Sequence, residues 1–235
     1  MKHSIDIVLP VYNESKNLEK RFIKLYEFLS KKIEQDWIIT IAENGSKDNT
    51  IQISKYLQKK YKKCRVISLD EPGKGQALKN AWLTSSANIY GYMDSDLSTD
   101  IEILPEFINK IVDENYDIVI ASRLIKGSNV IGRSLKREII SRTYSKIFRT
   151  ILSVNFYDAQ CGFKFAKKEA ILKVIDDCKD KEWFFDTEIL YKAEKNNLSI
   201  CEVPVTWVDD RDSSVNIIST IINDLIGLVR LRLGK

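Results

Sequence analysis

Two aspartates separated by one serine, Asp94 and Asp96, stand directly after a short hydrophobic run at 89–93. The run holds isoleucine and tyrosine and is followed at once by polar turn residues, which is typical of a buried strand. Two carboxylates at the carboxyl end of such a strand can turn toward one point and hold a hard divalent cation, and that cation can hold a diphosphate. Taken alone, the same spacing also fits an ordinary solvated turn.

Several kinds of catalytic site are disfavoured by the residue types. The only histidine is His3, which argues against a Ser-His-Asp or Cys-His site and against a His-based zinc site. The four cysteines form no Cys-x-x-Cys pair, which indicates reduced thiols in a cytosolic protein. No run approaches the roughly 18–20 apolar residues of a membrane span, and no secretory signal is expected at the start. The net charge of +4 is too small to indicate nucleic acid binding.

The elements that must position the aspartates alternate along the chain. Hydrophobic runs predict strands, and stretches with helical periodicity follow them. Such alternation predicts an α/β fold with a mostly parallel, Rossmann-like sheet, right-handed crossovers and helices on both faces. The expected strands are 5–9, 37–42, 65–69, 89–93 and 118–121, and the expected helices are 18–32, 50–60, 75–85 and 103–114.

Polar turns follow the first four strands, at 10–14, 43–50, 71–75 and 94–96. Because parallel strands end at the same edge, these turns bring acids, amides and glycines to the edge where open α/β sheets bind ligands. A Rossmann dehydrogenase would carry Gly-x-Gly-x-x-Gly after the first strand, and that turn contains no glycine. A Walker A loop is also missing from the sequence, so both common nucleotide folds are disfavoured.

Five segments in the first half of the chain match the motifs of one family in their order; they are Val8–Glu14, Glu43–Thr50, Gly73–Gly75, Asp94–Asp96 and Ala121–Arg123. With them the chain resembles the family-2 inverting glycosyltransferases, which have a GT-A fold. The second half looks like the polyprenyl-phosphate (dolichyl-phosphate) sugar synthases, with matches at Arg133–Ser141, Asp158–Lys164, Phe185–Glu188 and Glu202–Trp207.

The strings Gln-Cys-Gly-Phe-Lys and Phe-Asp-x-Glu favour the dolichyl-phosphate glucosyltransferase-like branch over the mannosyl branch. Two segments depart from the family pattern. Glu43 and Asn44 stand where paired aspartates are usual, which alters how the base is held. Near the end, 212–215 reads Asp-Ser-Ser-Val where the family shows Ser-Lys-Val, so a lysine near the phosphates is missing, and Arg211 is expected to supply part of its charge.

The resemblance implies transfer of a hexose, from UDP-glucose, to dolichyl or polyprenyl phosphate with inversion. Asp94 and Asp96 would hold Mg²⁺ or Mn²⁺. A phosphate acceptor is already ionised and needs no general base, so the protein's task is to neutralise phosphate charge. Residues expected at the nucleotide sugar are Pro10, Tyr12, Glu14, Ala42, Asn44, Lys74, Asp94, Ser95, Asp96, Ser98, Asp186 and Glu188. Asp186 and Glu188 are assigned to the donor sugar because carboxylates beside aromatic residues often hydrogen-bond sugar hydroxyls. The neighbouring aromatic residues could line a sugar or prenyl site, and for them packing in the core stays an alternative; they are Trp183, Phe184, Phe185 and Trp207.

The acceptor phosphate needs cations. Between Arg123 and Arg149 the sequence contains eight basic residues and only one acidic residue, Glu138. A helix over 133–152 turns by about 100° per residue, which sorts these residues onto two faces. The inward face holds Arg133 and Arg137 together with Ile140, Tyr144, Ile147, Phe148 and Ile151. The opposite face holds Arg142, Lys146 and Arg149. We expect Arg123 and Arg137 to act in catalysis by gripping the acceptor phosphate with Ser141 and Arg211, and the outer basic residues to face water or anionic headgroups. A salt-bridged, solvated helix is the alternative.

The sequence predicts a catalytic GT-A domain over 1–212 and an amphipathic helix over 213–235. Such a helix can lie in a membrane interface, dock on a membrane-anchored protein partner or pack on its own domain. The expected protein is peripheral, on the cytoplasmic face of a membrane.

Three other functions stay open. They are mannosyl transfer from GDP-mannose or transfer of another UDP-sugar, transfer to a carbohydrate acceptor, and a non-catalytic nucleotide-sugar binding module. The intact aspartate pair disfavours the last of these.

Overall fold

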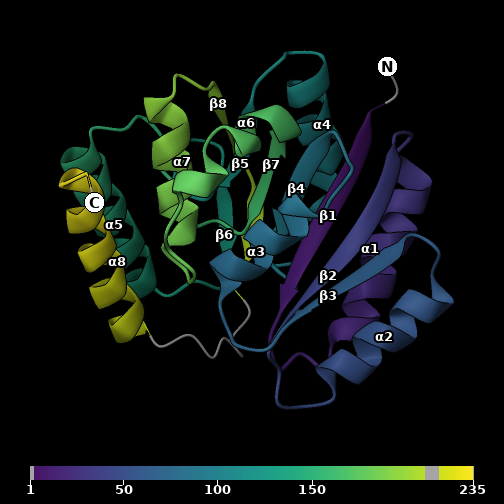
Figure 1. Cartoon of the computed structure of the whole chain (residues 1–235). Coiled ribbons are helices and arrows are strands. Elements are labelled where there is room, and N and C mark those ends of the chain that lie inside the picture. The colour runs from purple at the N-terminus through teal and green to yellow at the C-terminus, as the bar shows by residue number, and fades with distance from the viewer. Residues whose placement is uncertain (1–2, 210–216, 235) are drawn as a thin grey trace.

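A seven-stranded sheet forms the centre of the computed structural model, which describes residues 3–209 and 217–234 (Figure 1). The strand order is β3-β2-β1-β4-β7-β5-β8, and β7 alone runs antiparallel to its neighbours. The predicted mostly parallel α/β fold is therefore confirmed. The strands are β1 (Ser4–Val11), β2 (Asp36–Asn44), β3 (Cys64–Leu69), β4 (Ile89–Met93), β5 (Ile118–Ser122), β7 (Phe163–Lys167) and β8 (Ile200–Pro204).

Helices cover both faces of the sheet, as the alternating pattern predicts. Along β1, Ile5 and Ile7 face one core and Val8 faces the other, because successive side chains of a strand point to opposite sides. The first core is closed by α1 (Leu18–Lys32), α2 (Thr50–Lys60) and α4 (Leu104–Val112). The second is closed by α3 (Lys74–Leu83), α5 (Leu135–Leu152), α6 (Lys168–Leu172), α7 (Phe185–Lys195) and α8 (Ile217–Arg232). Two short 3₁₀ helices, η1 (Ile101–Ile103) and η2 (Ile175–Asp177), complete the described elements.

The antiparallel strand β7 brings the second half of the chain against the aspartate pair. Gly91 of β4 faces Phe165 of β7, and a Cβ atom at Gly91 would lie 2.2 Å from the ring. Because Gly91 has no side chain, the Phe165 ring can lie directly over the backbone of β4 at this position. Just before β7, the Gly162 carbonyl accepts a hydrogen bond from the Asp94 amide at 2.8 Å.

A small parallel ribbon is formed by β6 (Asn129–Ile131) and β9 (Thr206–Val208). It joins the arginine-rich segment, residues 123–149, to the loop after β4. Trp207 forms an isolated bridge with Thr99, and the Val208 amide donates to the Ser98 carbonyl at 2.8 Å. The ribbon therefore fixes the start of α5 relative to the aspartate pair.

The helix predicted over 133–152 begins at Leu135, so Arg133 lies in the turn before it. Two details of the predicted helical faces are wrong. Ile147, expected inside, is 36% exposed, whereas Ser145 is buried and donates to the Tyr157 carbonyl. Arg149, expected to face water, lies with its guanidinium carbon 3.6 Å from the centroid of the Tyr157 ring. The loop that contains Tyr157 supplies these contacts, and the periodicity of the helix carries no information about that loop.

The C-terminal helix α8 lies beside α5 at one end of the molecule (Figure 1). Its inner face contains Leu228, Leu231 and Gly227, where a Cβ atom would lie 2.4 Å from the Phe184 ring. The helix therefore packs on its own domain through one side. The domain boundary expected at 212/213 lies outside the described residues. Among the described helices, none is long and apolar enough to cross a membrane.

A buried acid on α8 predicts a pH-dependent stability. Burial raises the pKa of Asp224 to about 7, against hydrogen bonds from Gln160 and Tyr144 that lower it. Between about pH 4 and 7 the folded state then binds more protons than the unfolded state, so this group's contribution to stability falls as the pH rises. Asp224→Asn is expected to raise the melting temperature at pH 8 by several degrees, on the order of 5 °C, and to change it little at pH 5.

Thermal unfolding at both pH values measures the effect, with the exposed Asp176→Asn as the matched control. An equal shift at both pH values for Asp224→Asn would show that protonation of Asp224 plays no part.

Candidate active site

The Asp94 carboxylate is pressed against the backbone of Gly162. A Cβ atom at Gly162 would lie 1.9 Å from Asp94 Oδ2 and 2.0 Å from its Cγ, so only glycine fits there. Asp96 lies in the same turn, where its Oδ1 accepts a hydrogen bond from the Ser98 amide at 2.9 Å. Ser95 and Ser98 are buried beside the pair. The turn thus holds the two carboxylates on a rigid backbone.

The electrostatics of the aspartate pair suit a divalent cation. Burial, and then the negative charge of Asp94, raise the pKa of Asp96, and a cation between the two would relieve both effects. Within the described ranges, no group of three histidine, cysteine, aspartate or glutamate side chains could hold a metal. Two carboxylates leave room for phosphate oxygens and water, which is the usual environment of Mg²⁺ at a nucleotide.

Lys74, at the start of α3, connects Asp94 to Asp186 on α7. Its Nζ lies 3.1 Å from Asp94 Oδ1 and 3.2 Å from Asp186 Oδ2, and the side chain is buried. Burial opposes the charge of the ammonium group, but Asp186 and Asp94 outweigh it and raise the pKa of Lys74. The lysine is therefore a fixed positive charge beside the aspartate pair.

Asp186 lies behind Lys74 and is held by two cations and a phenol. Its Oδ1 accepts hydrogen bonds from Lys164 Nζ at 2.7 Å and from the Tyr92 hydroxyl, while Oδ2 faces Lys74. Burial alone would raise the pKa of Asp186, but the charges of Lys164 and Lys74 outweigh it and the pKa is lowered. Asp186 is consequently an ionised carboxylate with both oxygens engaged. Lys164, which the sequence did not single out, belongs to this site.

Glu188 has other partners. Residues two apart on a helix point about 200° apart, so Glu188 faces away from Asp186. Its Oε2 accepts from the Lys179 amide at 3.0 Å and from the Asp180 amide at 2.7 Å, and it lies 3.1 Å from Arg230 of α8. The described structure therefore does not bring Glu188 to the aspartate pair, and its contacts tie α7 to α8.

The turns after β1 and β2 form the next part of the same edge. Tyr12 is 41% exposed, Pro10 is half-buried beside it, and Ala42 is buried. Glu14 lies 2.8 Å from Arg21, and its amide donates to the Thr50 hydroxyl.

The unusual pair Glu43 and Asn44 makes contacts within these turns. Glu43 accepts from the Ser46 amide and the Ser68 hydroxyl, and Asn44 Oδ1 accepts from the Gly73 amide at 2.7 Å. The pair thus connects the turns after β2 and β3.

The arginine-rich segment is only partly free to take an anion. Arg123 makes three hydrogen bonds to Asp158, through its amide, Nε and Nη2, at 2.8–2.9 Å. Arg137 Nη1 lies 2.5 Å from Asp209, and the Ser141 hydroxyl accepts from Arg133. The charges of Arg123 and Arg137 are therefore already paired in this state. Arg211 lies outside the described residues.

Comparisons with known proteins agree with this geometry. The model of the glycosyl transferase family 2 matches residues 6–175. Glycosyltransferase AglD of Haloferax volcanii is 32% identical over 95% of this chain and 35% of its own length, so the chain spans about a third of that relative. The dolichyl-phosphate beta-glucosyltransferase of Dictyostelium discoideum is 30% identical over 97% of this chain and 73% of its own length. The dolichyl-phosphate beta-glucosyltransferase of Saccharomyces cerevisiae is 29% identical over 86% of this chain and 66% of its own length.

Solved structures show the same fold. Glucosyl-3-phosphoglycerate synthase from Mycobacterium tuberculosis, in complex with Mn²⁺, UDP and glucosyl-3-phosphoglycerate, aligns over 99% of this chain and 80% of its own, with a TM-score of 0.72 and 18% identity. Its complex with Mn²⁺ and UDP-glucose gives a TM-score of 0.70 at 18% identity, over 99% and 79% of the two chains. This similarity shows the predicted GT-A fold. Motifs, fold and the match over most of the sequence together show that the chain belongs to glycosyl transferase family 2.

Proposed function

We propose that this protein transfers glucose from UDP-glucose to dolichyl phosphate, or a related polyprenyl phosphate, with inversion at the anomeric carbon. Two relatives that it matches at about 30% identity are named dolichyl-phosphate beta-glucosyltransferases. The Mycobacterium tuberculosis enzyme of the same fold is known in complex with Mn²⁺ and UDP-glucose.

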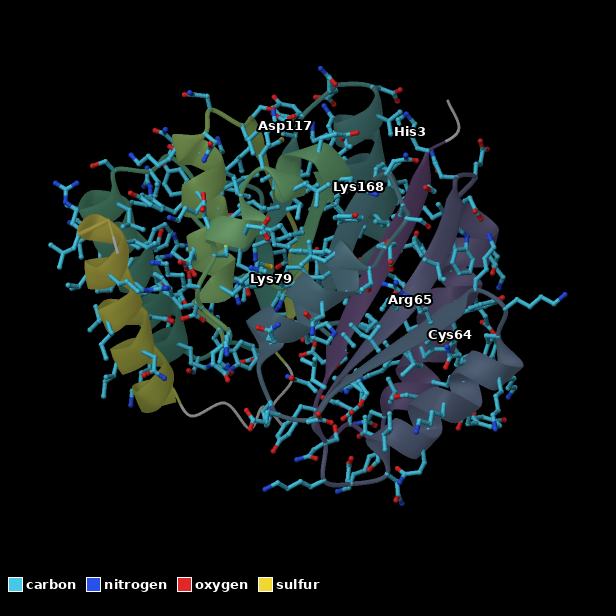
Figure 2. The ribbon with its side chains drawn as sticks, in the orientation of Figure 1. His3, Cys64, Arg65, Lys79, Asp117 and Lys168 are labelled. Atoms are coloured by element: carbon cyan, nitrogen blue, oxygen red, sulfur yellow. The ribbon has the colours of Figure 1, made fainter. Side chains whose placement is uncertain are left out.

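The observation that carries the proposal is the state of Asp186. An alcohol acceptor needs a general base. Asp186 and Asp94 both contact Lys74, which puts Asp186 in the region where such a base would act. Its carboxylate is buried and engaged by Lys74, Lys164 and Tyr92, and the two lysines lower its pKa, so it is a poor base. His3 lies at the amino end of β1, away from the edge that carries Pro10 and Tyr12 (Figure 2). A phosphate acceptor, which arrives ionised, avoids the need for a base.

The donor half of the reaction falls to Asp94, Asp96 and Lys74. The two aspartates would hold Mg²⁺ or Mn²⁺, which when bound supplies positive charge for the leaving diphosphate. Lys74 adds a second positive charge beside Asp94. Ser95 and Ser98 line the same turn, while Asp186 keeps Lys74 in position.

The nucleotide would lie along the neighbouring turns of the sheet edge. The base and ribose would bind there through Pro10, Tyr12, Glu14, Ala42 and Asn44, with the exposed Tyr12 ring as a surface for the base.

The acceptor half needs no proton transfer. An anionic phosphate oxygen forms a bond to the anomeric carbon, and the bond from that carbon to the UDP oxygen breaks, so the charge passes from one phosphate to another. Arg123, Arg137, Ser141 and Arg211 would hold the incoming phosphate close to the leaving diphosphate against their mutual repulsion.

The membrane would meet the end of the molecule formed by α5 and α8. Leu135 and Ile139 of α5 are 83% and 65% exposed. The outer face of α8 exposes Ile222, Leu225, Ile226 and Val229, and Leu233, just after the helix, is also exposed. Basic residues beside this surface, such as Arg142 and Lys146, are also exposed, and each adds about 1 kcal/mol of attraction to anionic lipids. A peripheral position on the cytoplasmic face would bring the site to its lipid acceptor, and a membrane-anchored protein is the alternative occupant.

The proposal predicts one lipid-linked product. Purified protein with Mn²⁺ and dolichyl phosphate is offered UDP-glucose, UDP-N-acetylglucosamine or GDP-mannose, and the lipid extract is analysed by chromatography. Product is expected from UDP-glucose only, lost with EDTA and restored by Mn²⁺ or Mg²⁺. Product from GDP-mannose alone would move the protein to the mannosyl branch, and no product from any donor would contradict the proposed acceptor.

A further inference from the structure

The arginines between residues 123 and 142 outnumber the acids that pair with them, and two of these arginines, Arg123 and Arg133, lie on the Trp207 ring. Asp158 pairs with Arg123, and Asp209 pairs with Arg137. A third acid, Glu138, is shared by Arg133 and Arg142. Four guanidinium groups thus face three carboxylates within these ion pairs. Water screens the charge of Arg142, which is 58% exposed, whereas Arg133 is buried and shares its one carboxylate with Arg142. Because a buried charge must be balanced, the surroundings of Arg133 are a place for an anion.

Arg133 is the member of this cluster whose charge is least satisfied. Its side chain is 8% exposed, and its guanidinium lies 5.7 Å from the Trp207 ring centroid. Its buried Nε has no hydrogen-bond partner within the part of the chain that the structure describes. Burial, and then the charge of Arg123, lower the pKa of Arg133. The negative charges of Glu138 and Asp158 therefore do not fully offset the burial of this guanidinium and the repulsion from Arg123.

Glu138 balances Arg133 weakly. Its Oε2 lies 3.3 Å from Arg133 Nη1, whereas Oε1 lies 2.6 Å from Arg142 Nε. The Glu138 side chain is 27% exposed and sits in the first turn of α5, so it can turn to Arg142 alone. A phosphate monoester brings up to two charges and three acceptor oxygens, and it would satisfy Arg133 better than this carboxylate does.

The position of Arg133 suits a phosphate beside the donor. Arg133 packs on Trp207, which is bridged to Thr99 at the end of the loop that carries Asp94 and Asp96. Arg123 lies on the same tryptophan, and the charge of Asp94 is among those that act on it. An anion held by Arg133 would therefore lie near the leaving diphosphate.

We propose that Glu138 stands in for the acceptor phosphate, and that the acceptor displaces it so that Arg133 binds the phosphate. The inference rests on the proposed function and extends it. Arg133 becomes the residue that selects phosphorylated acceptors, and Ser141, which accepts a hydrogen bond from Arg133, positions its guanidinium. Glu138 becomes a competitor that the acceptor must replace.

The test uses farnesyl phosphate as a soluble acceptor, with UDP-glucose and Mn²⁺. Arg133→Gln is expected to raise the KM for farnesyl phosphate at least about tenfold, as loss of a charge-assisted hydrogen bond implies. Glu138→Gln is expected to lower that KM severalfold, because the phosphate no longer displaces a carboxylate. Both variants should bind UDP-glucose with unchanged affinity by calorimetry. Lys136→Gln removes the same charge from an exposed residue at the start of α5, three positions after Arg133, and it should leave the KM unchanged.

The outcomes separate this inference from the proposed function. Transfer to farnesyl phosphate by the wild-type protein tests the function alone. If that fails, direct calorimetric binding of farnesyl phosphate tests the inference, with weaker binding expected for Arg133→Gln and tighter binding for Glu138→Gln. Should Arg133→Gln not fold, Arg133→Lys keeps a charge without the planar fork, and its KM is expected to rise less. An unchanged KM for the folded Arg133 variant, or a raised KM for Glu138→Gln, would overturn the proposal.

Discussion

Replacing Gly162 by alanine is expected to abolish metal-dependent binding of UDP-glucose in a protein that still folds. The new Cβ atom would lie within about 2 Å of the Asp94 carboxylate, which must rotate away. The backbone cannot yield instead, because the Gly162 carbonyl holds the Asp94 amide and the next residue pairs with Met93 in the sheet. Loss of one of the two metal ligands should lower kcat/KM at least about 100-fold. This decrease corresponds to a loss of about 2.7 kcal/mol of transition-state stabilisation.

Calorimetric titration of Mn²⁺ in the presence of UDP measures this effect, with thermal unfolding as the check on folding. Asp94→Asn removes the same ligand without a clash. The double variant should therefore be no worse than either single variant, since both act through one carboxylate. A Gly162→Ala protein with wild-type Mn²⁺ affinity would show that Asp94 is not held by this contact.

Local sequence patterns predicted most of the sheet edge that carries Asp94, Asp96 and the turns after β1 to β3. Helices 18–32 and 50–60 and strand 89–93 appear with the predicted bounds, because each has a clear period and polar ends. The order of strands and turns then placed Asp94 and Asp96 at the sheet edge, beside the turns after β1 to β3. Motif resemblance predicted the family that the comparisons show.

The pairing of charges could not be predicted from the sequence. Lys74 and Asp186 are 112 residues apart, and Tyr92 and Asp186 are 94 apart. They meet because β7 enters the sheet beside β4 and α7 packs against α3, which no local pattern specifies. The same limit applies to Arg123 and Asp158. Their ion pair leaves Asp158 unavailable to Arg133, whose Nε has no hydrogen-bond partner among the described residues. Sequence spacing also grouped Glu188 with Asp186, although helical geometry separates them.

A phosphorylated acceptor is expected to receive glucose at least about 1000-fold faster than the matching alcohol, because general-base assistance of about that size is missing. Lys164 and Lys74 lower the pKa of Asp186 and hold its carboxylate, so Asp186 is a poor base for an acceptor hydroxyl. The rate with the phosphate should level off above about pH 7, since the second ionisation of a phosphate monoester lies near pH 6. The lowered pKa of Asp186 means that its own ionisation should add no rising limb in that range.

The most direct test of a base-free transfer is a comparison of dolichyl phosphate and dolichol. Both are presented in the same detergent with radiolabelled UDP-glucose and Mn²⁺, and the labelled lipid is counted after extraction. Product is expected from dolichyl phosphate, and none above background is expected from dolichol. Comparable transfer to dolichol would mean that a protein group removes the acceptor's proton, and it would contradict the role given to Asp186.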